Sequence, residues 1–339
     1  MSQYFSQQHG RPAHSPDYLI TIAGQSISPE LDARLVALTL VDKRGFESDQ
    51  LDITLSDHDG KLALPSRGAE LQLAIGWKQS GLVDRGTYIV DEVEHSGAPD
   101  QLIIRARAAD MRKDLPGKRS QSWHQVSVSD IISTVAARYL LEPRISAKLA
   151  GIIIEHIDQT DESDMHFLTR LGERYDADAT IKAGNLLFIP KGKGETASGQ
   201  TIPAVLLTRD VGDSHRYTIT DRDAFSGVKA YWHNAATAER ISVIIGSDEN
   251  PKTLRGDFAN EESALQEANA EWQRIRRAGA TLNLELAEGR PNLYPETPVI
   301  ASGWKPEIDN TPWVITEVTH TITDSAYTAS VVMEVIEEA

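Results

Sequence analysis

The feature that most constrains the fold is a pair of similar stretches that lie more than two hundred residues apart. Each begins with Gly-Trp-Lys, at 76–78 and 303–305, and continues into an aromatic residue, two aliphatic residues and the pattern Glu-Val-x-His. The aromatic residue follows the tryptophan by 11 positions in the first copy and by 9 in the second, a difference that a loop tolerates. The separation is too long for a solenoid repeat. It predicts one β-domain used twice, with other structure inserted between the copies.

Alternating apolar residues support a β-rich organisation on both sides of the insertion. Strands are predicted at 18–22, 34–41, 50–55 and 70–75 before it, and at 227–232, 240–245, 281–286 and 298–302 after it. We expect a first β-barrel domain at 18–115, preceded by a flexible arm at 1–17. A second β-barrel domain is expected at 200–339. It carries one amphipathic helix at about 260–278, which ends at Gly279.

The middle of the chain, 116–199, has the pattern of a small α/β domain. Ser127 to Asp130 fits a capping box before helically spaced apolar residues, and Pro143 lies just past the end of that helix. A second helix is predicted within 158–178, capped by Thr160 or Asp161, and a hairpin turn at 183–185. The predicted fold class is therefore mostly β with an α+β insert: two related β-barrel domains separated by a small α/β domain, with an extra helix in the second half.

Composition limits the possible functions. The 339 residues allow two or three domains, and a net charge of −16 without a basic segment disfavours a protein that grips nucleic acid. The absence of cysteine excludes disulfides and thiolate metal sites. No run of about 18 apolar residues is present, so no membrane segment is predicted. The N-terminus lacks the apolar core of a secretory signal, and we expect synthesis and retention in a cytoplasm.

Candidate chemical sites were weighed against structural explanations. Glu92 and Glu317 each precede a histidine by three positions, which places the two side chains on opposite faces of a strand unless a bulge intervenes. We expect His95 and His320 to share a structural role, such as a polar contact at the end of a strand. A second group has residue types that bind metals but matches no known ligand spacing. Acidic residues at the start of a helix complement the helix dipole, which explains the group without a metal. Its members are His156, Asp158, Asp161, Glu162, Asp164 and His166.

No catalytic signature emerges. Lys191 to Gly194 lacks the frame of a phosphate-binding loop, and no nucleophile elbow is present. Paired carboxylates for glycoside cleavage remain open, because fifty acidic residues give many accidental pairs. We therefore predict no catalytic residue, cofactor or metal site. The tryptophans are expected to be core or interface anchors.

Several stretches together resemble the late control gene D proteins of contractile-tailed phages. They are SDQLDITLSD (48–57), LPSRG (64–68), GTYIVDEVEHSGAPDQLIIRARAAD (86–110) and QTDESDMHFLTRLGERYDA (159–177). The run from Glu262 to His320 continues the likeness, which covers nearly the whole chain after residue 17. These proteins are baseplate hubs, related in fold to the hub half of VgrG spikes and to the hubs of phage-tail-like bacteriocins.

The resemblance implies a homotrimer that joins a sixfold tail tube to a threefold central spike, since three chains with two barrels each supply six similar units. The implied partners are the spike, the tube, other baseplate proteins and the tape measure protein, in a particle assembled in the bacterial cytoplasm. We expect inter-barrel contacts on the strands around Trp77, Tyr88, Trp304 and Trp313. The rival hypotheses are a cell-wall hydrolase at the tail tip and a free-standing carbohydrate-binding protein. An aromatic content of 6% gives the latter little support.

Overall fold

The structure is a computed structural model that describes residues 14–22, 25–46, 49–109, 117–182, 184–220, 225–234 and 237–336. Most of the predicted N-terminal arm lies outside these residues, and its last two residues, Pro16 and Asp17, already belong to the first strand. The chain is mostly β, as the sequence predicts. Among the described residues, no helix is long and apolar enough to cross a membrane.

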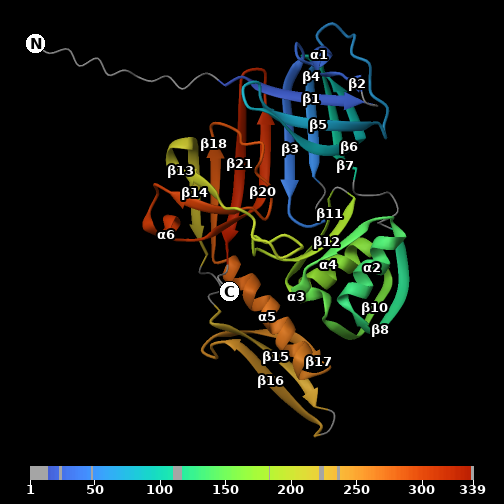
Figure 1. Ribbon diagram of the computed structural model, residues 1–339, viewed down its shortest axis with the longest axis vertical. Coiled ribbons are helices and arrows are strands. Elements are labelled where there is room, and N and C mark those ends of the chain that lie inside the picture. The colour runs from blue at the N-terminus through green and yellow to red at the C-terminus, as the bar shows by residue number, and fades with distance from the viewer. Residues whose placement is uncertain are drawn as a thin grey trace, which may run out of the picture.

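The first β-region comprises seven strands and one short helix, drawn in blue to cyan in Figure 1. Its elements are β1 (Pro16–Ile22), β2 (Gln25–Ser26), α1 (Ser28–Leu31), β3 (Leu35–Lys43), β4 (Gln50–Ser56), β5 (Glu70–Trp77), β6 (Gly81–Ser96) and β7 (Gln101–Ala108). The strands alternate buried and exposed residues, so one face of each supplies the core of this region.

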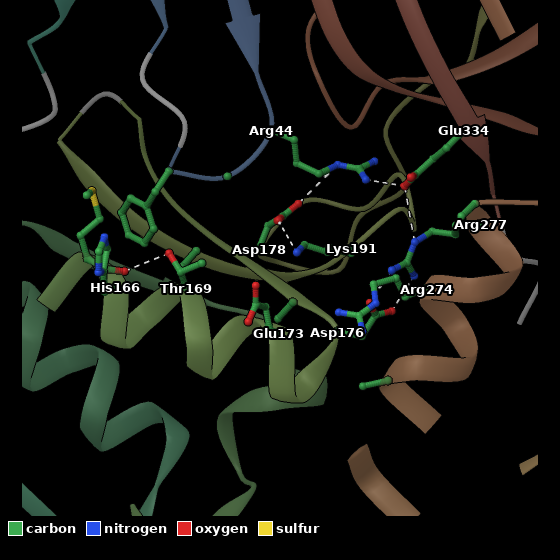
Figure 2. Close-up of a pocket in the computed structure, with 17 residues that line it drawn as sticks. Arg44, His166, Thr169, Glu173, Asp176, Asp178, Lys191, Arg274, Arg277 and Glu334 are labelled. Carbon is green, nitrogen blue, oxygen red and sulfur yellow. Dashed lines mark hydrogen bonds and ion pairs between the residues drawn. The ribbon is translucent and has the colours of Figure 1, made fainter. Parts of the chain in front are cut away.

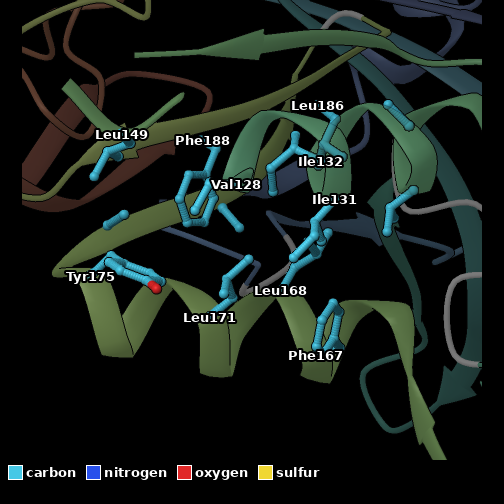
Figure 3. Packing of buried hydrophobic residues seen from close by; sticks show 14 of the residues in the cluster. Val128, Ile131, Ile132, Leu149, Phe167, Leu168, Leu171, Tyr175, Leu186 and Phe188 are labelled. Atoms are coloured by element: carbon cyan, nitrogen blue, oxygen red, sulfur yellow. The ribbon is translucent and has the colours of Figure 1, made fainter. Parts of the chain in front are cut away.

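The insert follows, drawn in green (Figure 1). Its elements are β8 (Lys118–Ser127), α2 (Val128–Arg138), β9 (Glu142–Ile145), α3 (Ala147–Ala150), β10 (Ile153–Ser163), α4 (Asp164–Tyr175), β11 (Ala177–Lys182) and β12 (Asn185–Pro190). The predicted capping box of α2 is confirmed, with Ser127 and Asp130 bonded reciprocally. Helix α4 instead has Ser163 as its cap, because β10 continues through the predicted caps. Figure 3 shows how α2 and α4 pack their apolar faces around Phe188 of β12.

The second β-region contains six strands: β13 (Val205–Thr208), β14 (Gly212–Ile219), β18 (Ala280–Leu286), β19 (Pro298–Ser302), β20 (Trp313–Ile322) and β21 (Tyr327–Val335). Two short helices accompany them, η1 (Arg209–Val211) and α6 (Pro306–Asp309). Its core is separate from that of the first β-region, although Ile322 and Tyr327 at the β20–β21 turn pack into the first core.

A small lobe interrupts the second β-region between β14 and β18. It consists of β15 (Gly227–Asn234), β16 (Glu239–Gly246), β17 (Pro251–Phe258) and α5 (Glu261–Arg277), and it projects at the bottom of Figure 1. The predicted helix is confirmed. The strands predicted at 227–232 and 240–245 do not join the second β-region, however. They form a separate three-stranded sheet with its own small core against α5.

The two β-regions repeat one strand order. The first runs β3-β4-β7-β6-β5, and the second runs β14-β18-β21-β20-β19, with every neighbouring pair antiparallel. The order continues differently at the end, because β1 pairs with β5 antiparallel whereas β13 pairs with β19 parallel. The predicted duplication of one β-unit is thus visible in the topology. Closure of each unit into a barrel stays a prediction.

Irregularities in the strands repeat as well. The ladder between β6 and β7 shifts between Val90 and Glu92, and the ladder between β20 and β21 shifts between Ile315 and Glu317. A second pair of shifts occurs near the starts of β3 and β14. A β-bulge bends the strand that contains it and is a specific feature of a fold rather than a defect. Matching bulges therefore fix a residue-by-residue equivalence between the two β-regions.

The two β-regions join directly, edge to edge. Residues Glu317–Ile322 of β20 pair antiparallel with Lys43–Leu38 of β3, which links both regions into one 13-stranded sheet. The insert is therefore attached beside a continuous sheet (Figure 1).

Candidate functional site: the junction of the β-regions and the insert

Trp77, the tryptophan of the first Gly-Trp-Lys, connects the two β-regions. Its indole Nε1 donates a hydrogen bond to the Gly289 carbonyl at 2.9 Å, and its ring lies 5.1 Å from that of Tyr327. The Gly289 amide in turn donates to the Tyr327 carbonyl at 2.8 Å. A Cβ at position 289 would lie 2.3 Å from the Tyr327 ring, so this contact requires glycine. Both acceptors belong to the second β-region.

Arg85 of β6 makes the second connection. Its NH1 group donates to the carbonyls of Pro291 and Leu293 at 3.0 and 3.1 Å, and NH2 donates to the Asp42 carboxylate at 2.9 Å. The guanidinium also lies 4.1 Å from the centre of the Tyr294 ring, within cation–π range. The side chain is almost completely buried, and its charge is balanced by Asp42. Arg85 thus fixes the β18–β19 loop against the first β-region.

A network of charged side chains joins the insert to both β-regions (Figure 2). Arg44, in the β3–β4 loop, pairs with Glu296, Glu334 and Asp178, the last at 3.4 Å. Lys191, after β12, pairs with the other oxygen of Asp178 at 3.4 Å. Arg44 therefore bridges the insert and the second β-region from a position in the first.

Arg277, at the end of α5, extends this network to the small lobe. It pairs through two nitrogens with Asp176, the left-handed residue that ends α4, and its Nε lies 3.4 Å from Glu334. Only 4% of its side chain is exposed, so the pair is largely shielded from water. Removing either partner of such a shielded pair leaves a buried charge without compensation, which strongly destabilises the fold. All parts of the chain therefore converge on this network.

Burial raises the pKa values of carboxyl groups at this junction. Three cations, Arg44, Lys191 and Arg277, face four carboxylates in the network. Burial raises the pKa of Glu296 to about 7, although Arg44 and the Gly192 amide favour its ionised form. On the other side of Arg44, burial and the neighbouring Asp42 raise the pKa of Asp49 to about 6, against the effect of Lys182.

Two cavities flank Arg44. One of about 550 Å³ is lined by the network and by α4 (Figure 2). Another of about 750 Å³ lies among Asp42, Arg85, Lys182 and Tyr294. The charged groups lining both cavities are largely paired with one another, and no nucleophile with an adjacent base is found among them. The paired groups connect the two β-regions, the insert and the small lobe.

The four predicted interface residues lie mainly inside the chain. Trp313 is fully buried, Tyr88 is 2% exposed and Trp77 is 9% exposed, whereas Trp304 is half-buried. Their side chains therefore cannot supply contacts with another chain, except in part at Trp304. Trp77 does form an interface, but it is the intramolecular one between the β-regions. Contacts between chains on these strands stay a proposal, and they require the outward-facing neighbours.

The two repeated histidines do not share a role, and that prediction is wrong. His95 is partly exposed, and its Nε2 lies 3.2 Å from Asp57. His320 is fully buried, and its Nδ1 lies 2.9 Å from the Tyr327 hydroxyl. Burial, together with the nearby cation of Arg85, lowers the pKa of His320 to about 3. His320 lies at the junction, against Tyr327 and near Arg85, whereas His95 lies on the part of β6 beyond its last β5 pair.

The paired glutamates also stay apart from the histidines, as predicted. Glu92 bonds to Arg105 at 2.7 Å, and Glu317 lies 3.6 Å from Lys43. In the acidic cluster, Asp164 begins α4 as expected for a residue that complements the helix dipole. Burial opposes its ionised form, but hydrogen bonds from Gln159, Tyr139 and Arg138 outweigh that effect and lower its pKa.

Sequence reasoning missed the junction residues. Arg44, Arg85, Asp178, Arg277 and Glu296 are scattered singly over the chain, and none lies in a motif. One signal was present: Arg85 lies between the two matching parts of the first Gly-Trp-Lys repeat, and the second copy has no arginine there.

The fold and the junction define a structural protein built from a duplicated β-unit, and comparison with known proteins identifies its class. The chain belongs to the phage tail baseplate hub (GPD) family, whose sequence profile matches residues 46–326. It is 40% identical to the probable baseplate hub protein of Escherichia phage P2 over 361 residues, covering 95% of this chain and 93% of the relative. The protein of the same description from Escherichia phage 186 is 39% identical, with the same coverage.

A solved structure shares the fold. The 43 kDa tail protein of prophage MuSo2 from Shewanella oneidensis superposes with a TM-score of 0.70 at 15% identity, covering 93% of this chain and 97% of that one. The protein is a baseplate hub of a phage tail.

Proposed function

We propose that this hub is a homotrimer that joins a sixfold tail tube to a threefold central spike in a contractile tail. The observation that carries the proposal is the duplicated strand order, because three chains with two equivalent β-regions supply six similar units around one axis. On this proposal the protein is not an enzyme. Its partners are the tube, the spike, other baseplate proteins and the tape measure protein, and it assembles in the host cytoplasm.

Two open strand edges support the trimer. Within the chain, β20 pairs through Glu317–Ile322 with β3. The equivalent stretch of β6, residues 92–97, lies beyond the last β5 pair, Glu70 with Ile89, and is bonded only on its β7 side in the described part of the chain. The equivalent of β3 is β14, which pairs only with β18 among the described strands. Each edge thus lacks the partner that its counterpart has. Open edges readily add a strand from another chain.

The pairing within the chain predicts the register between chains. The matching bulges make Glu94 equivalent to Thr319, and Thr218 equivalent to Val41. Because Thr319 pairs with Val41, Glu94 should pair with Thr218 of a second copy. The same register places Ile219, which is 64% exposed in the single chain, opposite Val93 of that copy. Burying this isoleucine contributes about 1.5–3 kcal/mol per contact. Repeating the contact three times closes the ring.

Disulfide trapping tests both the trimer and its register, since the chain has no cysteine of its own. Paired antiparallel residues have Cα atoms about 4.5–5.5 Å apart, which suits a disulfide. The double variant Glu94→Cys with Thr218→Cys is expected to give a covalent trimer on oxidation. Thr319→Cys with Val41→Cys, the equivalent pair within the chain, is the positive control and should remain a monomer with no free thiol.

A shifted pair controls for register. Glu94→Cys with Arg216→Cys keeps the same face of β14 but moves the contact by two residues, to about 7–8 Å, and should not cross-link. Light scattering is measured alongside, alone and with co-expressed spike, where a trimer is three times 37.3 kDa. A trimer without the predicted cross-link would refute the register alone. A monomer under both conditions would refute the trimer.

The absence of catalysis is tested separately. Purified hub, alone and with the spike, is expected to leave peptidoglycan intact in a clearing assay. The reasoning is that the buried carboxylates of the junction are largely engaged with cations and with backbone amides, which leaves no positioned acid and base pair there. Clearing of peptidoglycan by the hub would restore the hydrolase hypothesis.

A further inference from the structure

The two-stranded sheet of the insert carries a pair of facing histidines on its outer side. Strands β8 and β10 place His124 and His156 directly opposite each other, while their inner side chains, such as Trp123 and Ile157, pack into the insert core. Both histidines are exposed. Their rings are stacked with centroids 4.5 Å apart, and the two Nδ1 atoms lie 3.0 Å from each other. The two Nδ1 atoms are therefore within hydrogen-bonding distance of each other across the sheet.

A neighbouring carboxylate fixes the state of one ring. Asp158 lies two residues after His156 on the same strand face, and its Oδ2 is 3.1 Å from His156 Nε2. A carboxylate only accepts hydrogen bonds, so His156 Nε2 is the donor in this contact. With that proton on Nε2, His156 presents the lone pair of Nδ1 to His124.

We propose that His124 and His156 chelate a divalent transition metal ion, of the class Cu²⁺, Ni²⁺ or Zn²⁺, through their Nδ1 atoms. Imidazole nitrogens suit these ions. Metal–nitrogen distances of about 2.0–2.1 Å in a tetrahedral site separate two nitrogens by roughly 3.4 Å, so the rings need to move apart by only a few tenths of an ångström. Asp158 supplies the carboxylate that orients a ligating histidine from outside the coordination shell.

This site has two protein ligands. Within the described residues, no group of three or more histidine, aspartate or glutamate side chains is arranged to hold a metal ion. The adjacent Glu155 is turned toward Asn260, the cap of α5, and accepts a hydrogen bond from it at 2.8 Å. Water completes the coordination in the isolated chain. No sequence motif indicates this pair, because its members lie 32 residues apart and meet only across the sheet.

The bound metal ion would hold β8 and β10 together. This sheet has only two strands, an arrangement that is marginally stable by itself and depends on packing against the rest of the insert. An ion that binds only the folded pair stabilises it through linkage. The inference is independent of the trimer, because both ligands belong to one chain.

The test is a calorimetric titration of the untagged full-length chain with CuCl₂, NiCl₂ and ZnCl₂ separately. One equivalent should bind, with Cu²⁺ bound most tightly. Replacing either ligand, His124→Gln or His156→Gln, should abolish this binding, and Asp158→Asn should weaken it by about 10- to 100-fold. The control is His233→Gln, an exposed histidine on β15, which should bind as the parent does.

Thermal unfolding provides a second readout. Saturating Cu²⁺ should raise the melting temperature of the parent and of His233→Gln, but not of the two ligand variants. Far-ultraviolet circular dichroism verifies that every variant is folded. Equal metal binding by the parent and the His124→Gln variant would overturn the proposal, as would no binding at millimolar metal. In either case the two rings share only an N–H to N hydrogen bond.

Discussion

Replacing Trp77 with phenylalanine isolates the hydrogen bond that connects the two β-regions. The change removes the indole donor and leaves the buried Gly289 carbonyl without this partner. Loss of a partner for a buried acceptor costs about 1–3 kcal/mol. Trp304 is the matched control, since it occupies the equivalent place in the second Gly-Trp-Lys, and its buried Nε1 has no hydrogen-bond partner. Trp304→Phe removes no hydrogen bond and should therefore destabilise the chain less than Trp77→Phe does.

Hydrogen exchange measures this difference locally, which suits a chain with several cores. The Gly289 amide is protected by its bond to the Tyr327 carbonyl, so opening of the junction exposes it. A loss of 1–3 kcal/mol corresponds to exchange about 5- to 140-fold faster in Trp77→Phe. Exchange of the same peptide should be unchanged in Trp304→Phe. Equal acceleration in both variants, or none in Trp77→Phe, would refute the assignment of Trp77 to the junction.

Three further predictions concern buried charges. Because Glu296 keeps a proton up to about pH 7 when folded but only to about 4.5 when unfolded, its contribution to stability should fall by up to about 3 kcal/mol as pH rises through that window. Glu296→Gln should flatten that part of the urea-unfolding profile, and an unchanged slope would argue against the shift. His320, with its pKa lowered to about 3, should destabilise the fold as pH falls below 6.5, and His320→Gln should remove this acid sensitivity. An acid-unfolding profile unchanged by His320→Gln would assign the sensitivity to another group. Arg277→Ala strands the Asp176 carboxylate and should cost about 3–5 kcal/mol in unfolding free energy, against less than about 1 kcal/mol for the exposed ion pair removed by Arg240→Ala. Similar losses in the two variants would show that the junction pair is not effectively buried.

Much of the fold follows from local patterns. The period of apolar residues locates most strands, the reciprocal bonds of Ser127 and Asp130 start α2, and the apolar stripe of α5 predicts that helix. These features depend on residues within a few positions of one another. The start of α4 is an instructive exception. Thr160 and Asp161 are both suitable caps, but they lie in a bulge of β10, whose pairing with β8 resumes at Glu162 and Ser163, and the cap passes to Ser163.

The sequence by itself determined that one β-unit occurs twice, that other structure separates the copies and that the chain resembles baseplate hubs. It did not determine which strands pair across the copies, because that pairing joins residues nearly three hundred positions apart. The tertiary structure alone decided that the indole nitrogen of Trp77 is hydrogen-bonded and that of Trp304 is not. It also decided that His320 is buried whereas His95 is partly exposed, and that His124 meets His156. The physical reason is that the period of apolar residues along a strand shows which face of the strand each side chain lies on. The partner of that side chain is supplied by a distant strand or loop that packs against the same face.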